Sequence, residues 1–198
     1  MNKSYTEIVE TYKRVILSQP FPPRDDSSEW ELLHVNCYAV ALQLKMANLS
    51  PFLHRIAPGF LTKEITSCIF PTNILYPEHI IRGFKRDCHA LGRSCRKTTL
   101  HGKIPPNSYK VAVYCKPGRD FHFIRQNSDG TWFEINGWDG DFRKVPEQEI
   151  TRDDDGYQFL GIYAISQKGW ASPFLFYFIL VTIKVKLAVS VLYANYKK

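Results

Sequence analysis

Apolar and polar positions along the chain change their period, from a helical spacing in the first half to alternation in the second. Residues 4–18 carry apolar side chains three and four positions apart, which predicts a first helix. Ser4 followed by Glu7 is a capping-box pattern at its start. A Pro-rich connector closes this helix, and Pro77-Glu78 opens another that is expected to run to about Leu91.

A central helix is predicted from Asn36 onward. The stretch that follows is apolar on nearly all sides, as in a helix buried in a core, and Pro51 is expected to end it. Asn36 is a favourable N-cap residue, which places Cys37 at the first helical position. Between Pro51 and Pro77 the pattern is mixed, with a short helix expected over 61–70.

The second half predicts strands at 109–115, 120–127, 131–136 and 157–165, with loops at 137–141 and around the acidic residues 147–155. Helices first and an antiparallel meander afterwards indicate the α+β class. The abrupt change in composition near Gly169 divides the chain further. We expect an N-terminal helix and connector over 1–29, the main domain over 30–168 and an appendage over 169–198.

The hairpin around Ser128-Asp129-Gly130 can be tested for register. A three-residue loop with Gly130 in the left-handed conformation pairs Asn127 with Thr131 and gives each strand one apolar face. A two-residue Asp-Gly turn would instead place Glu134 among phenylalanines. With the three-residue loop the apolar face carries Phe121, Phe123, Phe133 and Ile135, and the other face carries His122, Ile124, Trp132, Glu134 and Asn136.

Two features of this pattern carry chemistry. A cysteine at a helix N-terminus lies near a partial positive charge and unpaired backbone N–H groups, which favour a thiolate and could form an oxyanion hole. His122 beside Glu134 on one face of a hairpin is the arrangement of a general base and its orienting partner. Cys37 alone is better explained as a small buried residue, but together with His122 it indicates a thiol hydrolase.

The opening Asn36-Cys37-Tyr38-Ala39, followed by a strand that bears His122, resembles a papain-like cysteine hydrolase of the NlpC/P60 kind. The run from His122 to Trp132 also resembles a segment of bacterial papain-like proteins, and the resemblance covers about residues 30–166. It implies a nucleophile at the start of the central helix, a base on a strand and a third polar residue about twelve positions later. That position is Glu134, an acid where a histidine is more usual.

The resemblance implies a cysteine peptidase or amidase with a triad of Cys37, His122 and Glu134, or failing that Asn136, working through an acyl-enzyme on a peptide or amide substrate. No metal or organic cofactor is implied. Cys88, His89 and Cys95 could be metal ligands, but two reduced thiols near a helix are the simpler interpretation. The alternatives are a papain-like module without turnover that binds a partner, and a membrane-associated toxin or effector.

The charge of the chain bears on which binding partners are expected. The 198 residues carry a formal charge of +7, and a basic face is expected from Arg82 to Lys103. This face has no interleaved aromatic residues, so nucleic acid is not an expected partner. The start of the chain has no apolar region of a signal peptide, which predicts a cytoplasmic protein or one secreted by another route.

The apolar tail leaves three alternatives open. Residues 171–194 are long enough to cross a bilayer, but Lys184 and Lys186 near the middle would each cost about 2.5–3.5 kcal/mol there. The segment is therefore expected to anchor in a membrane, to lie on a membrane or partner surface, or to pack on the domain. The sequence predicts nothing about the oligomeric state.

Overall fold

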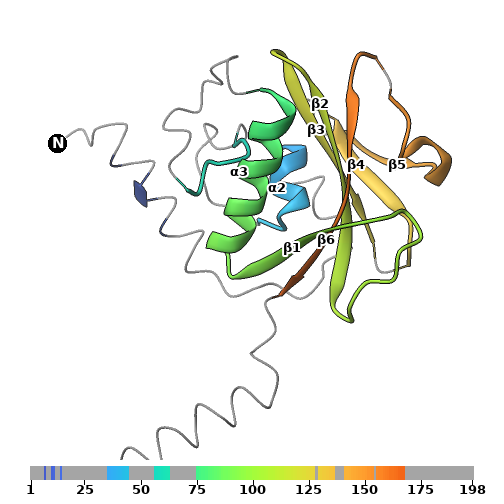
Figure 1. Cartoon of the computed structure of the whole chain (residues 1–198), viewed down its shortest axis with the longest axis horizontal. Coiled ribbons are helices and arrows are strands. Elements are labelled where there is room, and N and C mark those ends of the chain that lie inside the picture. Colours follow the sequence, from blue (N-terminus) through green and yellow to red (C-terminus); the bar gives the residue numbers. More distant parts are fainter. Residues whose placement is uncertain are drawn as a thin grey trace, which may run out of the picture. The chain divides into compact units, whose positions relative to one another are not determined.

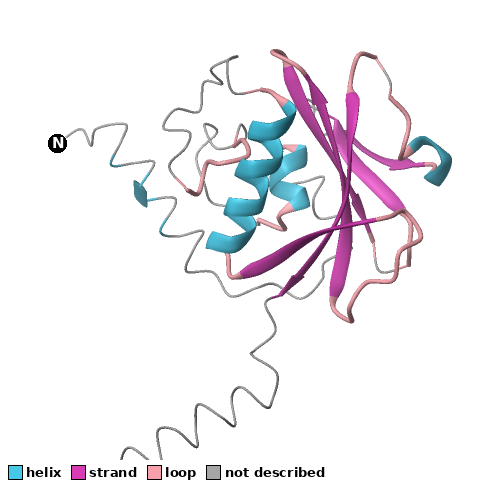
Figure 2. Cartoon of the chain, in the orientation of Figure 1, coloured by secondary structure: helices cyan, strands magenta, loops and turns pink. Residues whose placement is uncertain are grey.

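In the described part of the chain, helices combine with a six-stranded sheet (Figures 1 and 2). This fold is seen in a computed structural model that describes residues 7, 10, 11, 14, 35–44, 56–62, 75–127, 129–136, 141–153 and 155–167. The helices are α2 (Cys37–Ala41) and α3 (Pro77–Ala90). The other elements are β1 (Arg93–Thr98), β2 (Ser108–Lys116), β3 (Asp120–Gln126), β4 (Trp132–Asn136), β5 (Asp141–Val145), the 3-10 turn η4 (Glu147–Glu149) and β6 (Gln158–Gln167). The predicted α+β class is confirmed.

The strand order is β1-β6-β2-β3-β4-β5. Strands β2 to β5 form the expected antiparallel meander, but β6 returns to pair with the other side of β2. The predicted simple meander is therefore incomplete. Two strands were also missed: β1, which had been assigned only to a basic run, and β5, which begins at Asp141 where a loop was expected.

Each strand has two different faces, and both are buried in part. The first face packs against α2 and α3 in the larger apolar cluster, as Figure 1 shows for the helices. The opposite face carries a smaller cluster that includes Ile124, Trp132 and Val145. The alternation predicted for the hairpin is confirmed, because Phe121 and Phe123 join the helices while Ile124 joins the second cluster.

The predicted register of this hairpin is also confirmed. Arg125 pairs with Phe133 and Gln126 with Trp132, which is the pairing that a three-residue loop requires. The Asn127 N–H donates to the Thr131 carbonyl at 2.7 Å. Gly130 has a φ of 88°, in the left-handed region where glycine carries no Cβ penalty.

Helix α2 starts as predicted but is much shorter than expected. The Asn36 side chain accepts from the Ala39 N–H at 2.9 Å, which confirms the N-cap. The helix then ends at Ala41, because Gln43 takes a left-handed φ of 49° and the Leu44 N–H donates back to the Ala39 carbonyl at 2.9 Å. This is a Schellman ending without glycine. The prediction of a helix that continues toward Pro51 is wrong, and residues 45–55 lie outside the described part.

Helix α3 matches its predicted bounds and supports the turn that carries α2. Its buried Asp87 accepts from the Tyr38 hydroxyl at 2.7 Å and from the Gly59 and Leu61 N–H groups at 2.8 and 3.1 Å. The Asn36 side chain also donates to the Ile56 carbonyl at 2.7 Å. Segment 56–62 is thus tied both to α3 and to the N-cap of α2.

The basic face predicted over Arg82 to Lys103 is exposed at Arg82, Lys85, Arg86, Arg96, Lys97 and Lys103. Arg93 departs from it, since this side chain is buried and donates to the Leu42 carbonyl at the end of α2. The guanidinium thereby satisfies a carbonyl that the short helix leaves without an intrahelical donor.

Several expectations fall mostly outside the described residues. Of the predicted first helix, Glu7, Glu10, Thr11 and Arg14 are described and are helical. Of the short helix expected over 61–70, only Leu61 and Thr62 are described, and they lie in a turn. Residues 63–70 and the whole segment 169–198 lie outside the described part. Within the described part of the chain, no helix is long and apolar enough to span a membrane.

Candidate active site

His122 occupies the middle of the site and comes from β3. Its register partner on β2 is Tyr114, whose ring centroid lies 6.4 Å from the imidazole. The Tyr157 ring lies 6.2 Å away on another side. The imidazole is 18% exposed, so it remains accessible while its orientation is held by these two rings.

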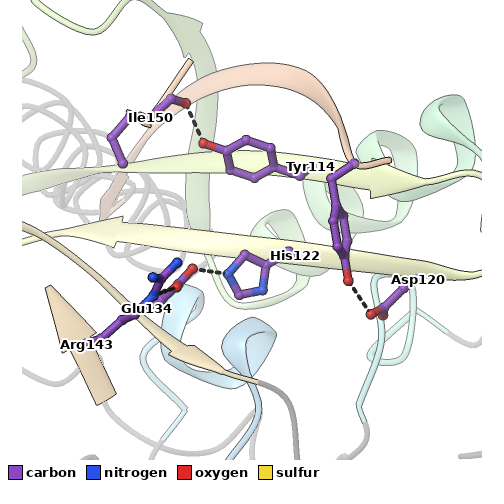
Figure 3. A network of polar contacts seen from close by, with 7 residues as sticks. Tyr114, Asp120, His122, Glu134, Arg143 and Ile150 are labelled. Atoms are coloured by element: carbon purple, nitrogen blue, oxygen red, sulfur yellow. Dashed lines mark hydrogen bonds and ion pairs between the residues drawn. The ribbon is translucent and has the colours of Figure 1, made fainter. Parts of the chain in front are cut away.

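Glu134 holds one ring nitrogen of His122. Its Oε2 pairs with Nε2 of the imidazole, as Figure 3 shows, and its side chain is 6% exposed. The second oxygen, Oε1, accepts from Nε of Arg143, the register partner of Glu134 on β5. Both carboxylate oxygens therefore have a partner, and the acid is fixed from β3 and β5 together.

Cys37 approaches the same imidazole from α2. This helix packs against β3, where the Tyr38 ring lies 4.9 Å from Phe123 and 6.1 Å from Phe121. The Cys37 thiol lies close enough to His122 to raise the pKa of the imidazole. Because Nε2 faces a carboxylate that only accepts, Nε2 carries the proton, and Nδ1 is the atom left to exchange a proton with the thiol.

The hairpin opens where these groups meet. The described ladder between β3 and β4 covers Arg125 and Gln126 with their partners, and stops short of His122. On its other side β3 pairs with β2 through His122, which is opposite Tyr114.

The charges around His122 favour the imidazolium. Burial by itself lowers the pKa of His122, but the hydrogen bonds and negative charges of Cys37 and Glu134 outweigh it and raise that pKa to about 10. Burial likewise raises the pKa of Glu134, and here the contacts with His122 and Arg143 prevail and lower it. The contact with Glu134 thus favours the imidazolium form of His122 and the carboxylate form of Glu134.

The short α2 changes one expectation. A macrodipole needs several aligned peptide groups, and five residues supply little of it. The partial positive charge that α2 contributes at Cys37 is therefore small. The imidazolium of His122 is the main positive charge near this thiol. Helical bonding does not use the first-turn N–H groups, but one of them, the Ala39 N–H, already donates to the Asn36 side chain.

The fourth predicted site residue, Asn136, ends β4 opposite Asp141. Its side chain lies outside the described atoms, so its role as a substitute for Glu134 stays a prediction. Sequence reasoning missed Arg143, although Phe142-Arg143-Lys144-Val145 alternates like a strand and follows a Gly-rich turn. It also missed Tyr157 and Asp120, which are joined by a hydrogen bond beside His122.

No group of three or more metal-ligating side chains is present among the described residues. Cys88 is buried and its thiol is a hydrogen-bond partner of the partly buried Cys95, whereas His89 on the same helix is exposed. The three residues considered as ligands thus do not converge.

No protein-family model, curated protein or solved structure matches the chain. The chemistry of the site must therefore be derived from the arrangement of Cys37, His122 and Glu134.

Proposed function

We propose that the protein is a thiol hydrolase of papain-like architecture that cleaves a peptide or amide bond through Cys37, His122 and Glu134. One observation carries the proposal: a single imidazole is paired with a carboxylate and lies close to a thiol that comes from a different element. A nucleophile, a base and a group that orients the base are what covalent hydrolysis requires.

The reaction would proceed in two steps. The Cys37 sulfur attacks the amide carbonyl, a C–S bond forms, and the C–N bond breaks as the amine takes a proton from His122. Water then attacks the thioester while His122 accepts its proton, the C–S bond breaks, and the acid is released. Glu134 would stabilise the imidazolium in the first step, and the Cys37 N–H would serve as one donor for the oxyanion.

The rate of Cys37 alkylation by iodoacetamide from pH 4 to 9 tests this proposal. We expect fast alkylation already near pH 6 in the wild type, because the imidazolium stabilises the thiolate, and a slower reaction in His122→Ala. Cys95 provides an internal control, since peptide mass analysis separates the two sites. A Cys37 rate that rises only near pH 8.5, as for an ordinary thiol, and ignores His122 would refute the hydrolase.

A second candidate is a papain-like module that binds a partner without turnover. It is favoured by the burial of Cys37, a residue that is only 7% exposed in the described structure. A thiol that alkylates slowly at every pH, in a chain that nonetheless binds a ligand beside His122, would support this candidate.

A further inference from the structure

A pocket opens beside His122 on the face of the sheet opposite α2 and α3. It has a volume of about 190 Å³. Its walls are Tyr114, Ile124, Val145 and Tyr157, with His122 and Glu134 along one side. Figure 3 shows Tyr114, His122 and Glu134. Cys37 does not line it, so a group held here would lie next to the reacting carbonyl and not at it.

The polar groups in the walls already have partners within the fold. The Tyr114 hydroxyl donates to the Ile150 carbonyl, and the Tyr157 hydroxyl donates to Asp120 (Figure 3). Burial raises the pKa of both tyrosines, so both are neutral phenols. Glu134 uses one oxygen for His122 and the other for Arg143. The tyrosines therefore present their ring faces, beside the aliphatic groups of Ile124 and Val145.

The charged residues at the rim of the pocket favour neither a positively nor a negatively charged ligand. Arg143 and Arg152 lie there with Glu149 and Asp155, two cations with two anions. Arg143 is engaged by Glu134, and Asp155 pairs with Lys116 at 3.3 Å. A charged ligand would be attracted by the two rim residues of opposite charge and repelled by the two of like charge. An uncharged apolar group would fill the interior and gain free energy from its transfer out of water.

We infer that this pocket is a specificity subsite, which binds one apolar side chain of the substrate, of the size of leucine or phenylalanine, beside the bond that Cys37 attacks. The inference rests on the proposed function. The size supports a single side chain, because pockets for whole drug-sized ligands are about 300–1,000 Å³. Burial of a Leu or Phe side chain corresponds to about a ten- to hundredfold gain in kcat/KM.

The test uses p-nitrophenyl esters of N-acetylated glycine, leucine, phenylalanine, lysine and glutamate with the full chain. We expect kcat/KM for the leucine and phenylalanine esters to exceed that for glycine about ten- to hundredfold, and lysine and glutamate to gain little. Val145→Trp should remove the preference by filling the pocket. Val145→Ala should shift it toward a tryptophan ester. Ala90→Trp, at an exposed position of α3, is the matched control and should change neither rate nor preference.

Binding without chemistry separates this inference from the proposed function. In Cys37→Ala, N-acetyl-phenylalaninamide should shift the methyl NMR signals of Ile124 and Val145, and N-acetyl-lysinamide should not. If the wild type hydrolyses no ester but these shifts occur, the hydrolase fails and the apolar pocket stands. If the esters are hydrolysed at equal rates, or the lysine or glutamate ester is preferred, the subsite is refuted while the hydrolase stands. Absence of both preference and shifts also refutes the subsite.

Discussion

Glu134 connects His122, the candidate base, to β5, a strand that was not predicted from the sequence. One of its oxygens faces His122 on β3, and the other faces Arg143 on β5. A glutamine here would keep the size and one acceptor oxygen, but would remove the negative charge. The carboxylate's effect on the imidazole can thus be separated from its packing.

In Glu134→Gln, the pKa of His122 should fall from about 10 toward the ordinary 6.5, because its carboxylate partner is lost. An NMR titration of the imidazole measures this directly. We expect kcat/KM to fall on the order of 10²- to 10⁴-fold, by analogy with loss of the acid in other triads. Arg143→Gln, which removes only the outer partner, should lower the rate less. An unchanged His122 titration in Glu134→Gln would contradict the assigned role.

The pair of His122 and Glu134 makes the stability of the fold depend on pH. The pKa of His122 is raised in the fold, so its contribution is complete below pH 6.5 and is lost as the pH rises toward 10. The pKa of Glu134 is lowered, so its contribution is present above 4.5 and is lost as the pH falls. The difference in unfolding free energy between wild type and Glu134→Gln should therefore be largest between about pH 4.5 and 6.5, measured by urea unfolding at pH 4, 5.5 and 9.5.

At Asp87, in contrast to Glu134, the effect of burial on the pKa outweighs that of the hydrogen bonds. Burial raises its pKa to about 6 despite hydrogen bonds from Tyr38, Gly59, Thr62 and Leu61. Because the fold disfavours its charged form, stability is lost as the pH rises from 3.8 through about 6. Asp87→Asn should thus destabilise the protein more at pH 4.5 than at pH 7.5. Urea unfolding at both values measures this. A larger destabilisation at pH 7.5 would show that the carboxylate's hydrogen bonds outweigh its burial.

At the scale of elements, Gly83 shows how closely α3 packs on segment 56–62. A Cβ at this position would lie 2.6 Å from the Pro58 carbonyl carbon and 2.7 Å from the Gly59 nitrogen. Backbone atoms in a segment tied to Asp87 and Asn36 have little room to shift. The same segment helps to hold the turn that carries Cys37, so packing of α3 bears on the site.

Gly83→Ala should destabilise the protein by about 1–2 kcal/mol. Alanine is favoured over glycine in a helix interior by about 1 kcal/mol, but overpacking typically costs about 1–3 kcal/mol and should prevail here. Chemical denaturation measures the change. His89→Ala, at an exposed position of the same helix, should stay within about 0.5 kcal/mol of the wild type. A Gly83→Ala chain more stable than the wild type would show that segment 56–62 yields to the added methyl.

For the whole molecule, the sequence predicted those features that depend on residues close together in the chain. The loop at Ser128-Asp129-Gly130 determined a register, and that register placed His122 and Glu134 on one face. The length of α2 could not be predicted this way, since an apolar run has no sign that Gln43 will adopt a left-handed φ. Strand β1 was missed for a related reason, because its Arg96 and Lys97 are exposed in the edge strand of the sheet.

The partners of the site illustrate the same limit. Arg143 contacts Glu134 only because β5 pairs with β4, and that pairing follows from the fold as a whole. The meeting of Cys37 with His122 depends likewise on how α2 packs against β3. Sequence spacing could indicate a nucleophile and a base, but not the positively charged group behind the acid.

The last prediction concerns the tail. All the site residues precede Gln158, and the compact unit that holds them ends at Ser166. A chain that stops after Lys168 should therefore unfold cooperatively, with an unfolding free energy within about 0.5 kcal/mol of the full chain, and should keep its Cys37 alkylation rate within about twofold. The removed residues include the apolar run 171–183, and Lys184 and Lys186 follow it. Those lysines favour a position at a lipid surface, so the full chain should sediment with anionic vesicles and the shortened chain should not. A shortened chain that loses cooperative unfolding would show that the tail belongs to the fold.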